Sequence, residues 1–253
     1  MTRDRLVLFT GLLTVVAMAW AWLLAGAGME MSAIAMTGMA GMDGWLMQPA
    51  LWTPAYAGLI FSMWWVMMVA MMLPSASPML LLFARLKRKL ASAPAGPTVL
   101  FVAGYLLAWG GFSAVATVLQ WALESGRLVS PMLVATNHWL GAAILVAAGS
   151  WQLTPLKALC LSQCRAPVAF LVGHWRAGQL GALRMGLEHG GFCLGCCWFL
   201  MLLLFVGGVM NLWWIVGLAV FVLLEKTIPL GHWLGRALGI VLVASGVLLA
   251  VRP

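Results

Sequence analysis

Four side chains that can bind a metal ion lie close together in the second half of the chain. His189, Cys193, Cys196 and Cys197 occur in the run H-G-G-F-C-L-G-C-C-W-F-L-M, at steps of four, three and one. On a helix with 3.6 residues per turn, these steps place all four within an arc of roughly 100°. Thiolate and imidazole are ligands of Cu(I) and Zn(II), so the spacing predicts a soft-metal face on one helix. The structural alternative is that the cysteines are small apolar residues and the glycines allow close helix contact.

Two further cysteines precede this run. Cys160 and Cys164 are one helical turn apart in C-L-S-Q-C-R, where two thiols at i and i+4 can ligate one ion. Lys157 and Arg165 lie nearby and favour the thiolate forms. The five cysteines of the chain all belong to these two groups, and an odd number argues against a purely paired disulfide framework.

Methionine is concentrated in two places. In the run M-W-W-V-M-M-V-A-M-M-L-P, one side of a helix would be lined by sulfur from Met67, Met68, Met71 and Met72. The interpretations are a path for a soft metal or ordinary packing, for which methionine is a flexible filler. Pro74 follows, and with Pro78 we expect it to bend or end this helix and to free backbone carbonyls.

The second methionine-rich stretch lies between residues 29 and 47 and is also rich in glycine. Its candidate ligands are Met36, Met39 and Met42, whose neutral thioethers prefer Cu(I) to hard ions and stay available in an oxidising compartment. A flexible segment lets several such sulfurs meet at one ion. An apolar interfacial loop that uses methionine as filler explains the same composition.

Composition places the chain in a membrane. It is 64% hydrophobic and only 8% charged, with a mean hydropathy of +1.04, which excludes a soluble globular domain. The net charge of +8 comes from short clusters beside apolar segments, where basic residues set orientation and meet lipid headgroups. We therefore expect a lipid bilayer as partner and no nucleic acid.

Seven apolar segments predict an all-α, polytopic membrane helix bundle with about seven transmembrane helices, at 6–27, 56–83, 98–123, 131–153, 192–209, 212–224 and 234–251. The first is longer than the ~7–15 apolar residues of a signal peptide, so we expect an uncleaved span. Residues 1–253 would form a single membrane domain with an outer methionine-rich loop at 28–55. A cytoplasmic loop at 154–186 would carry an amphipathic helix lying on the membrane surface at 166–186.

Orientation follows from the basic residues alone. They gather in the connections at 85–89, 157–184 and 226–236, which predicts these connections to be cytoplasmic and the N-terminus to be inside. All five cysteines, His189, Pro74 and Glu225 then fall towards the cytoplasmic side. Glu225 ends the sixth span, where it is either a functional carboxylate or part of a simple ion pair with Lys226.

These residues resemble a known family. The run Q-L-T-P-L-K at 152–157, the two cysteine groups with their flanking residues, M-N-L at 210–212 and the pair Glu225-Lys226 are similar to the bacterial predicted metal-binding integral membrane proteins. That family is otherwise carried as a domain of unknown function and is sometimes labelled copper-chaperone-like. The resemblance covers about residues 64–226 and implies metal binding, in a multi-pass protein of the bacterial inner membrane. The outer methionine-rich loop lies outside the shared motifs.

Two classes of function follow. The first is a protein that binds a soft transition metal, copper first and zinc as the alternative cofactor, and hands it to a metallochaperone or metalloenzyme or moves it across the membrane. The second is a membrane-embedded thiol-redox or metal-dependent oxidoreductase in which Cys193 and Cys196 form a C-x-x-C pair. No general base accompanies the cysteines, so the sequence favours a non-enzymatic role. No Rossmann or P-loop motif occurs, which argues against ATP-driven pumping by this chain alone.

Overall fold

The computed structural model describes residues 3–29, 31–38, 51–90, 96–130 and 134–251 of the chain. It is all-α, as the sequence predicts. In chain order the helices are α1 (Arg3–Leu24), α2 (Ala33–Gly38), α3 (Pro54–Leu90), α4 (Gly96–Ser125), α5 (His138–Gln152), α6 (Pro155–Arg165), α7 (Pro167–Gly173), α8 (Gly178–Leu202), α9 (Leu204–Gly207), α10 (Leu212–Thr227) and α11 (Gly231–Val251).

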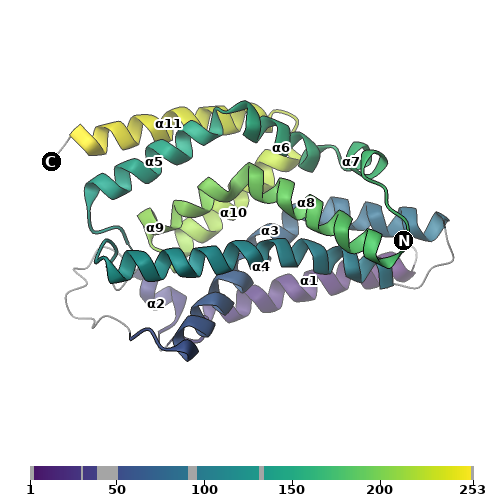
Figure 1. Ribbon diagram of the computed structural model, residues 1–253, viewed down its shortest axis with the longest axis horizontal. Helices are drawn as coiled ribbons and strands as arrows, with labels where there is room; N and C mark the ends of the chain where they lie inside the picture. The colour runs from purple at the N-terminus through teal and green to yellow at the C-terminus, as the bar shows by residue number, and fades with distance from the viewer. Residues whose placement is uncertain (1–2, 30, 39–50, 91–95, 131–133, 252–253) are drawn as a thin grey trace.

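The long helices pack as neighbours in a bundle (Figure 1). Helix α4 lies along α8, α3 packs on α4, and α1 packs on α3, while α5 and α11 form a second pair of adjacent helices. Close approach depends on glycine. A Cβ atom on Gly149 of α5 would lie 2.6 Å from the carbonyl oxygen of Gly239 of α11, so these two backbones touch where no side chain fits.

Every one of the seven predicted apolar segments coincides with a helix, but fewer helices are long and apolar enough to cross a membrane. Within the described residues, four qualify, namely the α3, α4, α8 to α9 and α11 regions. A fifth is added if α5 and α6, which meet at 63°, are counted as one bent span. The apolar part of α1, Leu8–Leu24, and the 16-residue helix α10 are shorter. That seven helices cross the membrane thus stays a prediction.

Helix α3 does not end at its prolines. It continues through Pro74 and Pro78 to Leu90, so the expected termination is wrong. The freed carbonyl has a partner, however. Pro78 lacks an N–H group for the carbonyl oxygen of Pro74, which instead accepts a hydrogen bond from the Ser77 hydroxyl at 2.8 Å.

The predicted surface helix at 166–186 is also wrong in extent. Helix α7 covers only Pro167–Gly173, and α8 begins at Gly178, whose φ of +77° is a left-handed conformation that favours glycine. The second half of the predicted surface helix is therefore the first part of α8. Pro155 and Pro167 stand at the starts of α6 and α7, where a missing N–H group costs nothing.

The basic connections meet at one end of the bundle. Lys87, near the end of α3, places its ammonium 4.7 Å from the ring centre of Trp175, which precedes α8. Arg165, the last residue of α6, donates hydrogen bonds to the carbonyl oxygens of Ile228 and Pro229 between α10 and α11, at 2.7 and 2.6 Å. The three connections that the charge pattern assigns to one side of the membrane are thus neighbours in space.

Candidate metal centre

Helix α8 carries the four candidate ligands on its buried face. His189, Cys193, Cys196 and Cys197 are at most 2% exposed, and the residues between them, apart from Gly190, are not fully buried. The spacing therefore places the four on one face, as the helical period requires. The face turns inward because α8 packs along α4 and against α6.

Helix α6 brings the other two cysteines to this face. It begins with a Thr154 cap, whose hydroxyl accepts a hydrogen bond from the Lys157 N–H at 3.2 Å. Cys160 lies directly over Gly195 of α8, where a Cβ atom would stand 2.6 Å from the Cys160 sulfur. Cys164 interacts with the side chains of Cys193 and Cys196. We call Cys160, Cys164, Cys193, Cys196 and Cys197 the thiol cluster.

Cys193 is at the centre of the thiol cluster. Its sulfur lies 3.2 Å from the Tyr105 hydroxyl of α4 and 3.0 Å from the Lys226 ammonium of α10. The same ammonium is 3.2 Å from the hydroxyl of Ser75. A buried ammonium needs a nearby acceptor or anion, and an adjacent positive charge stabilises anionic sulfur. Four helices therefore contribute to the surroundings of one thiol.

The side chains of the thiol cluster do not have the arrangement of a metal coordination shell. Among the residues that the structure describes, no three His, Cys, Asp or Glu side chains are arranged to hold a metal ion. Cys196 and Cys197 donate their S–H groups to the Cys193 carbonyl oxygen at 3.0 and 2.9 Å. Thiols are weak donors, so rotating these two side chains towards an ion costs little.

The methionines of α3 reach the thiol cluster at one point. Met67, Met68, Met71 and Met72 are at most 1% exposed. The sulfur of Met72 lies 4.0 Å from the sulfur of Cys197, so α3 supplies a thioether beside the thiols. Met67, Met68 and Met71 precede Met72 and lie further towards the start of α3.

Met36 lies apart from the thiol cluster. Met36 is buried in α2. The residue after it, Thr37, accepts a hydrogen bond from the Leu212 N–H at the start of α10. Lys226, which contacts the thiol cluster, is at the other end of α10. The structure thus does not bring Met36 to the cysteines. Met39 and Met42 lie outside the described residues.

A metal-ligand role for Glu225 stays a prediction, and its ion pair is not with Lys226. Its carboxylate pairs instead with the ammonium of Lys157 on α6, and both side chains are almost fully buried. This pair joins α6 to α10 and so holds Cys160 and Cys164 near α8. His189 is buried between aromatic rings, 5.2 Å from that of Phe170 and 5.8 Å from that of Tyr105, and its Nδ1 has no described partner.

Sequence reasoning missed Lys226 and Tyr105 as site residues. Lys226 was treated as a basic residue of a loop, although it ends a helix and is only 7% exposed. Tyr105 lies in a segment that the sequence predicts only as an apolar span, although it is fully buried beside Cys193. The sequence does hold a pattern that could have indicated Tyr105, because polar residues follow it on α4 at steps of three or four and so share its face of the helix.

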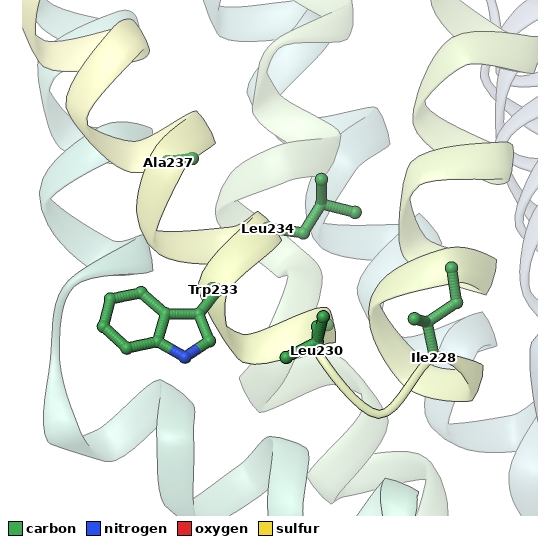
Figure 2. A pocket seen from close by; sticks show the side chains of 6 residues that line it. Ile228, Leu230, Trp233, Leu234 and Ala237 are labelled. Carbon is green, nitrogen blue, oxygen red and sulfur yellow. The ribbon is translucent and has the colours of Figure 1, made fainter.

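An apolar groove at the turn between α10 and α11 is not the metal centre. Figure 2 shows its lining, to which Ile228, Leu230, Trp233, Leu234 and Ala237 contribute. None of these side chains is a soft-metal ligand. The groove is typical of the lipid-facing surface that an apolar helix such as α11 leaves uncovered.

The fold and the thiol cluster define a helical protein with candidate membrane spans and several neighbouring cysteines. The profile of the PpoB2 copper chaperone family matches residues 61–249, and the chain belongs to that family. This confirms the family resemblance inferred from the sequence. No curated protein sequence and no solved structure matches the chain.

Proposed function

We propose that the protein spans the bacterial inner membrane, binds Cu(I) at the thiol cluster and passes it on along the methionines of α3. One observation carries the proposal: all five cysteines of the chain gather where α6 packs on α8, beside the Met72 thioether. Thiolates and thioethers are the ligands that Cu(I) prefers. Membership of a copper chaperone family supports copper as the cargo.

Binding follows from the contacts within the thiol cluster. On binding, Cys196 and Cys197 release their S–H protons to solvent and exchange the weak hydrogen bonds to the Cys193 carbonyl for bonds to the ion. Cu(I) is satisfied by two or three thiolates, and Lys226 offsets part of their negative charge inside the apolar bundle. Met72, at the edge, offers a neutral sulfur through which the ion can enter or leave.

A thiol-redox role is less well supported. Cys193, Cys196 and Cys197 are at most 1% exposed, and thiol–disulfide exchange needs an accessible sulfur. The same burial suits a bound metal, because exclusion of water protects Cu(I) from oxidation and exchange.

The test is metal content. The detergent-purified full chain is loaded with Cu(I) or Zn(II) without oxygen, and bound metal is measured by elemental analysis beside thiol titration. We expect Cys193→Ser and Cys196→Ser to abolish stoichiometric copper binding and His189→Ala to weaken it less. Ala182→Ser, another buried position on α8, is the matched control and should retain copper. Full copper content in both cysteine variants would show that the cysteines serve packing only.

A further inference from the structure

One face of α4 carries an uninterrupted line of hydrogen-bonding side chains. The steps along this line are four, four, four, three and four, so its members share one side of the helix. The line consists of Tyr105, Trp109, Ser113, Thr117, Gln120 and Glu124. All except Glu124 are at most 9% exposed. Buried polar side chains along a membrane helix are costly and commonly mark a route for ions or substrates.

This polar line faces α3. Near the outer end, the indole N–H of Trp64 donates to the Gln120 side-chain oxygen at 2.7 Å. Near the inner end, the Tyr105 hydroxyl donates to the carbonyl oxygen of Met72 at 3.3 Å. Trp64, Met68 and Met72 follow one another at steps of four, so they share a face of α3. A line with two sulfurs on α3 therefore runs opposite a line of polar groups on α4.

Both lines end at the thiol cluster. The Tyr105 hydroxyl lies 3.2 Å from the Cys193 sulfur, and the Met72 sulfur lies 4.0 Å from the Cys197 sulfur. Between the two ends, the indole N–H of Trp109 is buried without a hydrogen-bond partner among the described residues. An unpaired buried donor is rare in a folded protein, so Trp109 marks the one point of this interface where the described polar groups are not fully satisfied.

The other end of the polar line is closed by a hydrogen-bond network. The Glu124 carboxylate accepts hydrogen bonds from the Trp52 indole at 2.7 Å and from the Gln120 amide at 2.8 Å. Gln120 thus bridges Glu124 to Trp64, which is fully buried. In the sequence, Trp52 lies five residues after the methionine-rich stretch of residues 29–47.

We propose that Cu(I) enters between α3 and α4 and that Glu124, Gln120 and Trp64 form the outer gate of this route. The inference rests on the proposed binding of Cu(I) at the thiol cluster. Glu124 attracts the cation, and breaking the Trp64–Gln120 hydrogen bond opens the interface. Met68 and Met72 then offer neutral sulfur on one side while α4 offers oxygen on the other, so the ion is never fully desolvated.

The experiment measures the rate of arrival. The full chain is reconstituted in sealed vesicles with its outer side exposed, and chelator-buffered Cu(I) is added outside. The Cu(I)–thiolate charge-transfer absorbance reports ions that reach the thiol cluster. We expect Glu124→Gln to slow its rise at low free Cu(I) by on the order of tenfold, because the attracting charge is lost. Glu188→Gln is the matched control and should keep the wild-type rate, since Glu188 pairs with Arg176 and Arg184 away from this route.

A second pair of variants tests the sulfur line without changing charge. Met68→Leu conserves volume and should also slow the rise, whereas Met79→Leu, a buried methionine outside the line, should not. The final absorbance at saturating Cu(I) should be the same in every variant. Equal rates within both pairs would overturn the route while leaving binding at the thiol cluster intact. A wild-type protein without the absorbance would instead contradict the proposed function itself.

Discussion

The buried ion pair between Lys157 and Glu225 allows a quantitative test of how α6 is held. The two side chains are 3% and 1% exposed, so replacing Lys157 by Met leaves a carboxylate inside the bundle without its partner. Breaking a buried pair by removing one partner costs about 3–5 kcal/mol. Lys226 and Arg165 also act on the Glu225 carboxyl group, so we expect a loss of stability near the lower end of this range.

The assay is unfolding in detergent micelles, followed by tryptophan fluorescence as denaturant is added. The double variant Lys157→Met with Glu225→Gln removes the charge as well as its partner. It should therefore recover most of the stability that the single variant loses. The control is Arg184→Gln, which removes a pair with Glu188 in which the arginine side chain is 65% exposed. Such a surface pair contributes only about 0–1 kcal/mol.

If the Lys157→Met variant is no less stable than the Arg184→Gln control, the expectation is contradicted. This result would mean that Lys157 does not stabilise the buried carboxylate. A loss of stability that the double variant does not recover would assign the effect to the packing of the lysine side chain. Because the pair holds α6 in place, Lys157→Met should also lower copper binding, whereas the double variant should retain it.

Three further changes test other parts of the structure. Gly195→Ala places a methyl group 2.6 Å from the Cys160 sulfur, so it should weaken copper binding, measured by elemental analysis, and lower the thermal stability of the protein. Adding Cys160→Ala removes the clashing sulfur and should restore the thermal stability. Gly186→Ala, whose Cβ would lie 3.1 Å from the Phe101 Cα atom, should cost about 1–3 kcal/mol in the same unfolding assay, whereas Gly191→Ala, with open space, should not. Reporter fusions at residue 253 should be active only outside the cytoplasm and those at residue 93 only inside, and the reverse would contradict the proposed orientation.

Hydrophobic pattern was sufficient to find the helices but not their interruptions. The segment predicted at 131–153 ends where the helical path bends by 63° between α5 and α6, at Thr154-Pro155, but its hydrophobic pattern does not tell whether α6 continues the span. A proline is compatible with both a kinked helix and the start of a new one. The split between α7 and α8 depends on the left-handed backbone at Gly178, which amphipathic periodicity does not register.

The residues of the thiol cluster could be predicted because their spacing and the charge pattern are local properties. The partners of Glu225 and Lys226 could not. Consecutive residues on a helix point about 100° apart, so they do not face each other and cannot form the simple pair that their adjacency suggests. In the fold, Glu225 turns to α6 and Lys226 turns to Cys193 of α8. Only the packing of three helices around the end of α10 determines which charge meets which partner.

The polar line of α4 was missed for a different reason. Its helix is strongly apolar overall, so the hydropathy that identifies a span also hides the single face on which Ser113, Thr117 and Gln120 are buried. The Ser113 and Thr117 hydroxyls donate to the carbonyl oxygens of Trp109 and Ser113 at 2.8 Å, so their burial is satisfied within α4 while their oxygens can still accept. If Cu(I) passes between α3 and α4, replacing Thr117 by Val, which keeps the shape of the side chain but removes its oxygen, should slow the arrival of copper at the thiol cluster. The amount of copper finally bound should not change. If Thr117 only completes the packing of α3 on α4, that replacement should leave the rate unchanged.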